Sequence, residues 1–205
     1  MLFFIQFMGK KRCNWCRGDH LYENYHDTEW GVPVFEDNIL FESLTLEIFQ
    51  SGLSWITILK KREGFLKAFD SFDIYKIAAY DIKKEKELIA NTNIVRNNLK
   101  IKATINNAKA IIRIQEEYNS FSKYIWAYIN NDPIINKFKS LNEVPTNTPL
   151  SKKICIDLKK KGFKFIGPTI IYSFMQAIGM TNDHLIYCFC HPMQLIKKVN
   201  RRPLH

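Results

Sequence analysis

The chain lacks the features that mark membrane-spanning, secreted and repetitive proteins. No apolar run reaches the roughly 18 to 20 residues that a helix needs to cross a bilayer. Five cysteines in 205 residues are too few for a secreted disulfide scaffold, and an odd number leaves one thiol unpaired. The chain also has no internal repeat and no low-complexity linker. These absences favour a cytoplasmic globular protein with reduced thiols.

The two ends of the chain carry little structural signal. Residues 1–8 are apolar, but no basic residue precedes them and no small-residue cleavage site follows, so they fit a signal peptide poorly. With 46% apolar residues, the remainder can bury the core of one large domain or of two small lobes. We expect an N-terminal extension over residues 1–10, a single domain over 11–192 and a basic tail over 193–205.

Positive charge exceeds negative charge by a wide margin. Lysine and arginine number 30 against 20 acidic residues, which gives a net charge of +10. Such a balance fits a polyanionic partner, because basic side chains that neutralise phosphates gain affinity by releasing condensed counterions. A lysine-, asparagine- and isoleucine-rich composition that reflects coding bias is the alternative explanation.

Apolar residues recur at intervals of three and four through most of the chain, and strand-like alternation is rare. This pattern predicts an all-α fold. Pro168 is placed for a first helical turn, Gly162 and Gly179 for helix ends, and Asn182 for an N-cap. The predicted helices span about 37–51, 54–62, 73–79, 83–91, 97–118, 121–130, 151–161, 168–178 and 183–190.

The predicted helix over residues 97–118 is amphipathic. Its apolar stripe consists of Ile101, Ile105, Ala108 and Ile112. Its basic residues fall largely outside that stripe: Lys100, Lys102, Lys109 and Arg113. The aromatic N-terminal segment, the turn 91–98 and the loop 142–149 are expected to be irregular.

Two pairs of potential metal ligands lie at opposite ends of the chain. Cys13 and His26 lie near the start. His184 and Cys188 are four residues apart in the predicted last helix and would point to the same side. Together the pairs could form a closed tetrahedral Cys2His2 zinc site that joins the first loop to the last helix. Alternatively, His184 and Cys188 are packed side chains of the core.

A second set of potential ligands competes with the first. Cys13 and Cys16 form a CxxC, and Cys188, Cys190 and His191 offer further donors for a cysteine-rich ribbon. Cys188 and Cys190 would diverge on a helix, because residues two apart do not share a face. The pair compatible with a helix is the one spaced by four residues.

A carboxylate interrupts an apolar stripe in the predicted helix over residues 37–51. The stripe would continue through position 47, which holds a glutamate. Its apolar members are Leu40, Phe41, Leu44 and Ile48. Burying an acid is costly unless the acid meets a partner, so Glu47 is a candidate for a working site. The alternative is a buried salt bridge or an acid that caps a loop.

Aromatic residues cluster around this acid in the sequence. Three of the four tryptophans fall within the first 55 residues, where they and two tyrosines could wall a pocket in which a flat ring stacks. These residues are Trp15, Tyr22, Tyr25, Trp30 and Trp55. Core packing is the alternative for each of them.

The turn over residues 91–98 separates two predicted helices. Such a hairpin can present backbone N–H groups and the start of the next helix to a phosphate, with Arg96 and Lys100 nearby. A solvated connection between two helices is the alternative.

Several segments, taken in order, form a recognisable pattern. They are Cys13-x-Trp15, Tyr25 to Pro33, Leu46-Glu47, Ser51 to Glu63, Lys160 to Gly167 and Asn182-Asp183-His184. This pattern resembles the DNA-3-methyladenine glycosylase I family, the constitutive bacterial Tag type, over roughly residues 11–192.

The resemblance implies a helix-hairpin-helix DNA glycosylase fold, with two helical lobes around a base-binding cleft. It also implies one structural zinc ion per chain that clasps the two ends together. The implied metal ligands are Cys13, His26, His184 and Cys188, which leaves Cys16, Cys190 and His191 as bystanders. The implied base pocket contains Glu47 and Tyr25 as catalytic residues, with Trp15, Trp55, Tyr22 and Trp30 as binding residues.

The resemblance also implies how DNA is held. Gly52-Leu53 would supply an apolar wedge for the gap that an extruded nucleotide leaves. Asn93 stands where the family usually has glycine, and asparagine is the next-best residue for a left-handed turn. The duplex would be gripped by the hairpin, which contains Asn93, and by the basic residues Arg96, Lys100 and Lys164.

The implied activity is excision of 3-methyladenine from double-stranded DNA by a monomeric bacterial enzyme of base excision repair. Methylation makes the base cationic and a good leaving group, so a strong acid or base is not required. A non-enzymatic zinc-dependent DNA-binding module is one alternative, but it would not explain the buried acid. A zinc deaminase is another, but its His-x-Glu and Pro-Cys-x-x-Cys signature is missing.

Overall fold

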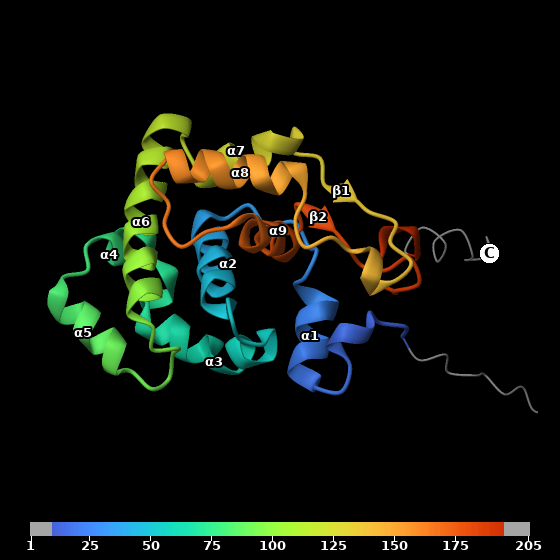
Figure 1. The fold of residues 1–205 in the computed structure, drawn as a ribbon, viewed down its shortest axis with the longest axis horizontal. Coiled ribbons are helices and arrows are strands. Elements are labelled where there is room, and N and C mark those ends of the chain that lie inside the picture. The colour runs from blue at the N-terminus through green and yellow to red at the C-terminus, as the bar shows by residue number, and fades with distance from the viewer. Residues whose placement is uncertain (1–9, 195–205) are drawn as a thin grey trace, which may run out of the picture.

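A computed structural model describes residues 10–194 of the chain. The predicted extension over 1–10 and tail over 193–205 lie outside this range, apart from Lys10, Met193 and Gln194. The described part is mostly helical, which confirms the predicted fold class, and it adds two short strands (Figure 1). None of its helices is both long and apolar enough to cross a membrane.

The elements follow one another with short connections. The helices are η1 (Asn14–Cys16), α1 (His20–Thr28), α2 (Asp37–Gln50), α3 (Trp55–Ala68), η2 (Asp70–Phe72), α4 (Ile74–Ala78), α5 (Ile82–Ala90), α6 (Asn98–Tyr118), α7 (Phe121–Trp126), η3 (Ala127–Ile129), η4 (Leu141–Glu143), α8 (Pro149–Lys160) and α9 (Pro168–Ala177). The strands are β1 (Ile134–Ile135) and β2 (Thr181–Asn182), which pair in parallel.

Helix α2 stands at the centre of the molecule (Figure 1). It packs against α3, α6, α7 and α9, and nine of its fourteen residues are buried. Because side chains on nearly every face meet a neighbouring helix, the removal of apolar surface from water on all sides stabilises this arrangement. Residues 44–49 are all buried, so a polar side chain in this part of α2 lies in the core.

Most predicted helix ends from α2 to α9 lie within two residues of the observed ones, but the helix predicted over 54–62 continues to Ala68 in α3. Pro168 occupies the first turn of α9, and Gly162 and Gly179 follow the ends of α8 and α9. Gly179 has a φ of +69°, and a Cβ there would lie 2.3 Å from the carbonyl carbon of Val32. Only glycine fits this close passage of two chain segments.

The predicted last helix over residues 183–190 is wrong. After β2 the chain continues as an irregular loop, because the pairing of Ile135 with Asn182 fixes an extended backbone at its start. Asn182 is therefore no helix cap. Its side-chain oxygen accepts from the backbone N–H of His184 at 3.3 Å and turns the chain locally.

An N-terminal helix was not expected from the sequence. Residues that were predicted to be irregular form α1, which begins after Asp19. The Asp19 carboxylate accepts from the backbone N–H groups of Leu21 and Tyr22, which satisfies two donors of the first turn. The aromatic residues of this segment are thereby displayed from a regular element.

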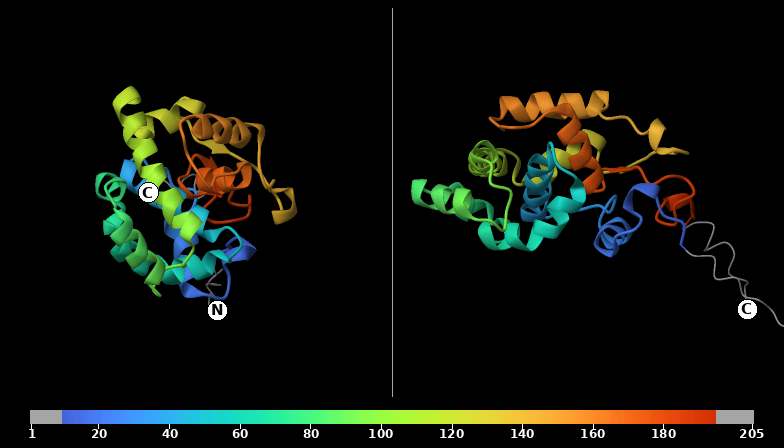
Figure 2. Two further views of the ribbon diagram at one scale, coloured as in Figure 1. Left: turned by 60° about the vertical axis from the view of Figure 1, so that its left-hand side comes forward. Right: turned by 60° about the horizontal axis from the view of Figure 1, so that its bottom comes forward.

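The start and the end of the described chain lie side by side (Figures 1 and 2). The backbone N–H groups of Gly31 and Val34 donate to Gln176 and Ile178 at the end of α9, at 3.0 and 3.1 Å. Farther along, the N–H of Phe189 donates to the carbonyl of Lys11 at 2.8 Å. These contacts bring both candidate ligand pairs to one end of the molecule.

We expect Gly179→Ala to destabilise the protein by roughly 2 to 3 kcal/mol, since the new Cβ adds both backbone strain and a clash. Urea unfolding followed by circular dichroism measures this change. Gly167→Ala is the matched control, because its φ is ordinary and no atom lies within 4 Å of the added Cβ. Equal losses of stability in Gly179→Ala and Gly167→Ala would contradict the close contact assigned to position 179.

Candidate active site

Cys13, His26, His184 and Cys188 converge at the junction of the two ends. Their donor atoms all lie within 4.8 Å of one another, and all four residues are buried. The His26 Nε2 lies 3.2 Å from the His184 Nδ1 and 3.4 Å from the Cys188 Sγ. The His184 Nδ1 lies 3.6 Å from the Cys188 Sγ and 3.8 Å from the Cys13 Sγ.

These separations fit a tetrahedral metal ion. Zinc bonds of about 2.3 Å to sulfur and about 2.0 to 2.1 Å to nitrogen put neighbouring ligands roughly 3.3 to 3.8 Å apart. The other ring nitrogens are also occupied, as orientation of a ligand requires. The His26 Nδ1 lies 2.9 Å from Asp27, and the His184 Nε2 lies 2.9 Å from the carbonyl of Trp30.

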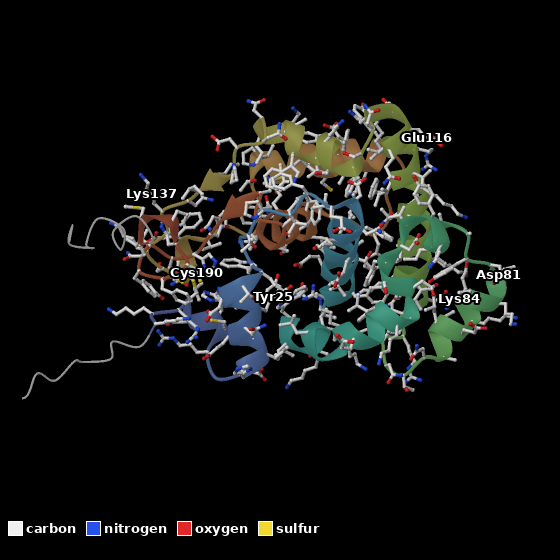
Figure 3. The ribbon with its side chains drawn as sticks, turned by 180° about the vertical axis from the view of Figure 1, so that it is seen from behind. Tyr25, Asp81, Lys84, Glu116, Lys137 and Cys190 are labelled. Carbon is white, nitrogen blue, oxygen red and sulfur yellow. The ribbon has the colours of Figure 1, made fainter. Side chains whose placement is uncertain are left out.

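Cys16, Cys190 and His191 are not members of this group of four, although Cys190 forms a second group with His26 and Asp27 whose potential ligand atoms also lie within 4.8 Å of one another. The Cys16 thiol donates to the Cys13 carbonyl at 3.2 Å, and the His191 Nε2 lies 2.9 Å from the carbonyl of Asn136. Cys190 approaches the backbone of His26 at 3.9 Å, close to the helix that carries Tyr25 (Figure 3). A cysteine-rich ribbon is thus not formed among the described residues.

A cavity of about 240 Å³ opens next to the metal-type cluster. It is lined by Trp15, Tyr22, Tyr25, Trp30, Glu47, Gln50, Trp55, Leu141, Val144, Ser173, Gln176 and Asp183. All six residues that the sequence suggested for a base pocket are among them. The volume is small for a ligand pocket and suits one flat ring.

The cavity wall is packed directly on the two histidines of the cluster. The ring of Trp15 lies 5.2 Å from His26 and 5.0 Å from Trp30, centroid to centroid. Trp30 in turn lies 4.7 Å from His184. A change in the position of either histidine would therefore move an aromatic wall of the cavity.

Glu47 reaches the cavity from the centre of α2. Its residue is only 6% exposed, and among the described residues its carboxylate has no hydrogen-bond or ion-pair partner. Desolvation by burial raises the pKa of Glu47 to about 8. The alternatives of a buried salt bridge and a capping acid are not what the structure shows. The carboxyl group is therefore largely protonated at neutral pH in the free protein.

Tyr25 and Trp55 face each other beside this acid. Their rings lie 5.2 Å apart and are tilted by 50°. Burial, and to a smaller extent the nearby Glu47, raises the pKa of Tyr25 well above its ordinary value, so its hydroxyl remains a donor. The indole N–H of Trp55 is buried without a hydrogen-bond partner in the described part of the chain. Buried polar groups without a partner are uncommon in proteins, which is consistent with a ligand-binding site around Glu47.

Four further polar residues of the cavity were missed by the sequence analysis. They are Gln50, Ser173, Gln176 and Asp183. Asp183 accepts hydrogen bonds from Tyr172 and Gln176 on one oxygen, and from Asn136 and Thr181 on the other. Only its place beside His184 could have drawn attention to it, because local spacing does not show that side chains of α9 and Asn136 meet around it.

The residues proposed for DNA contact fall into two groups. Gly52, Leu53, Arg96 and Lys164 are exposed, as a contact with DNA requires. Lys100 is not. It is 5% exposed, and its ammonium donates to the carbonyls of Phe49 and Ser51 at 2.9 and 2.6 Å. The expectation that Lys100 lies outside the buried face and grips phosphate is therefore wrong.

The turn over residues 91–98 forms without a left-handed residue at position 93. Asn93 is absent from the described residues with positive φ, so the expected reason for asparagine there is wrong. Instead, the Asn91 side chain accepts from the N–H of Asn93 at 2.9 Å and closes the turn. The turn packs tightly on α3, since a Cβ at Gly64 would lie 2.4 Å from the Asn93 carbonyl.

A helical protein with an unpartnered acid in a small aromatic cavity, next to a metal-type cluster, fits the class of base-excising enzymes. The methyladenine glycosylase family model matches residues 15–191, and the chain belongs to this family. It is 44% identical over 182 residues to DNA-3-methyladenine glycosylase 1 of Escherichia coli, which covers 89% of this chain and 97% of that one. The predicted family is thus confirmed.

Solved structures agree with this assignment. A crystal structure of a 3-methyladenine DNA glycosylase I matches with a TM-score of 0.86 and 47% identity, covering 89% of this chain and all of that one. The Staphylococcus aureus 3-methyladenine DNA glycosylase I, studied for its recognition of 3-methyladenine, matches with a TM-score of 0.85 and 36% identity. That match covers 88% of this chain and 96% of the other.

The protonated state of Glu47 predicts a pH-dependent stability. The folded pKa of about 8 lies above the ordinary value of 4.5, so Glu47 costs stability increasingly as pH rises between these values. We expect Glu47→Gln to be about 2 to 4 kcal/mol more stable than the wild type at pH 8. At pH 4.5 the two should be nearly equal. Urea unfolding at several pH values measures this difference.

Glu87→Gln is the control, because Glu87 is exposed on α5. It should leave stability almost unchanged across the same pH range. A constant difference between Glu47→Gln and the wild type from pH 4.5 to pH 8 would contradict the assigned protonation.

Proposed function

We propose that the protein hydrolyses the N-glycosidic bond of 3-methyladenine in double-stranded DNA and leaves an abasic site. The observation that carries this proposal is the unpartnered Glu47 inside an aromatic cavity of single-base size. In such a site, burial disfavours the ionised carboxylate unless a cation binds next to it. The match to relatives named for this activity supports the same substrate.

Glu47 selects the methylated base by charge. With a pKa of about 8, its ionisation at pH 7 costs only about 1.4 kcal/mol, and the proton passes to solvent. A cationic base placed against the carboxylate lowers that pKa and forms a charge-assisted hydrogen bond through its exocyclic amine. Neutral adenine provides no charge to offset the ionisation, so it is bound less tightly.

The aromatic walls supply the second part of recognition. The electron-poor ring stacks on Trp15 or Trp55, where the attraction of a cation to an aromatic face adds to the burial of apolar surface. Tyr22 and Trp30 complete the walls, and the Tyr25 hydroxyl donates to the base.

No residue of the cavity is built as a strong general base. A carboxylate has about four acceptor positions, and Asp183 already accepts four hydrogen bonds from neutral donors. Glu47 is largely protonated in the free protein. The reaction relies instead on the cationic base as leaving group, and on holding it out of the DNA stack.

Extrusion of the nucleotide is assigned to the turn at Gly52-Leu53. Leu53 is 40% exposed beside the cavity, and an apolar side chain there can fill the gap left in the duplex. Arg96 and Lys164 supply positive charge for the phosphates, and Asn93 presents the backbone of the 91–98 turn. Residues 11–192 then act as one domain with two lobes around the bound base.

The Cys2His2 cluster is proposed to hold one zinc ion with a structural role. Four protein ligands leave no open position for a metal-bound water, which disfavours a zinc hydrolase or deaminase. Zinc would hold the two histidines whose rings contact Trp15 and Trp30. The same proposal takes the protein to be a cytoplasmic monomer that acts on duplex DNA.

Release of free base from DNA treated with a methylating agent tests the activity. The wild type should release 3-methyladenine, and Glu47→Gln should release it on the order of a hundredfold more slowly at low DNA concentration, because the charged contact is lost. Chromatography of the released bases measures both rates. Absence of any methylated purine from folded wild type would remove the proposed function. Equal release rates of the two proteins would contradict the role of the Glu47 carboxylate.

Metal analysis tests the zinc proposal. We expect about one zinc ion per chain in the wild type. Cys188→Ser should lower both zinc content and thermal stability, because a buried ligand is lost. Cys190→Ser is the matched control and should retain the ion. Retention of full zinc by Cys188→Ser, or its loss from Cys190→Ser, would contradict the assigned ligand set.

A further inference from the structure

Lys100 is a basic residue of α6 that faces inward. It lies in the first turn of that helix, directly after the 91–98 turn, and its residue is 5% exposed. Burial lowers the pKa of its ammonium, which means that the surroundings resist the charge. A lysine in this place needs specific partners, and its partners lie at the end of another helix.

Those partners are two carbonyl oxygens at the C-terminal end of α2. The Lys100 ammonium donates to Phe49 and Ser51, at 2.9 and 2.6 Å. A helix leaves its last carbonyls without intrahelical donors and carries a partial negative charge at this end. The cation therefore satisfies the end of α2 at the point where the chain turns toward Gly52-Leu53.

The turn that follows is narrow and projects from the surface. Gly52 has a φ of +82°, and the N–H of Leu53 donates to the carbonyl of Gln50 at 2.7 Å. The amide of the Gln50 side chain donates back to the Leu53 carbonyl at 3.1 Å. The root of this turn, at Ser51, is held by Lys100.

A third segment meets the same ammonium. The ring of Phe165 lies 5.7 Å from the Lys100 Nζ, and Phe165 directly follows the exposed Lys164. On the other side, Asn97 caps α6 by accepting from the backbone N–H of Lys100 at 3.1 Å, next to the exposed Arg96. The ammonium thus contacts the wedge turn and the segment of Lys164, and the backbone of the same residue is bonded to the segment of Arg96.

We propose that Lys100 is a positioning residue that couples the grip on the DNA backbone to the insertion of Leu53. This inference rests on the proposed function, because it takes Leu53 to be the wedge. With the ammonium in place, phosphates held at residues 91–98 and 164 fix where the Leu53 side chain enters the duplex. Without it, the Phe49 carbonyl loses its donor and the turn moves independently of the grip.

The proposal predicts that Lys100→Met damages extrusion and leaves the base cavity intact. Single-turnover release of 3-methyladenine from methylated duplex DNA should slow on the order of tenfold to hundredfold, as expected for a misplaced wedge. The affinity for free 3-methyladenine, followed by tryptophan fluorescence, should be unchanged. Lys102→Met is the matched control, since Lys102 is exposed on the same helix and carries the same charge.

A double-mutant cycle with Leu53→Ala separates positioning from a general structural effect. Once the wedge is removed, Lys100→Met should cause no further slowing, because the two residues act as one unit. Multiplicative losses, an equal loss of affinity for the free base, or the same rate for Lys100→Met and Lys102→Met would each overturn the proposal.

A Lys100→Met protein that does not fold is replaced in the same cycle by Lys100→Gln, which keeps an N–H donor on a shorter side chain. The same outcomes then apply. Wild-type protein that releases no 3-methyladenine would remove the proposed function itself. If the wild type releases 3-methyladenine but the rate losses of the Lys100 and Leu53 variants multiply, only the proposed coupling is removed.

Discussion

The meeting of Cys13 and His26 with His184 and Cys188 is the contact on which the site depends. It brings together residues from opposite ends of the sequence within 4.8 Å. Ring packing extends this order from the histidines to Trp15 and Trp30, so the cluster shapes the cavity without entering it. The structural metal ion that we propose would explain why such reactive side chains are all buried at one point.

The cavity contains two acids in opposite surroundings. Among residues 10–194, Glu47 has neither a hydrogen-bond partner nor a counter-ion, and burial raises its pKa to about 8. Asp183 accepts four hydrogen bonds and is fully committed to the structure around β2. This difference supports the proposed recognition of a cation by Glu47, and the same buried acid is expected to cost stability as pH rises.

Lys100 illustrates how a net charge of +10 is divided between surface and interior. Composition indicates a polyanionic partner, but one of the lysines best placed in the sequence to contact it closes the end of α2 instead. The coupling that follows joins three segments proposed to meet DNA. It also explains why an ammonium is retained in a place where burial disfavours its charge.

The sequence by itself determined the helical class, most helix boundaries from α2 to α9, the four candidate ligands and the acid on the apolar stripe. Local periodicity and spacing carry that information, because they depend on near neighbours in the chain. Tertiary structure alone decided the loop after Asn182, the inward direction of Lys100, the form of the turn at Asn93 and the saturation of Asp183. Each of these depends on partners more than thirty residues away or on a competing local hydrogen bond, as with β1 for Asn182 and the end of α2 for Lys100.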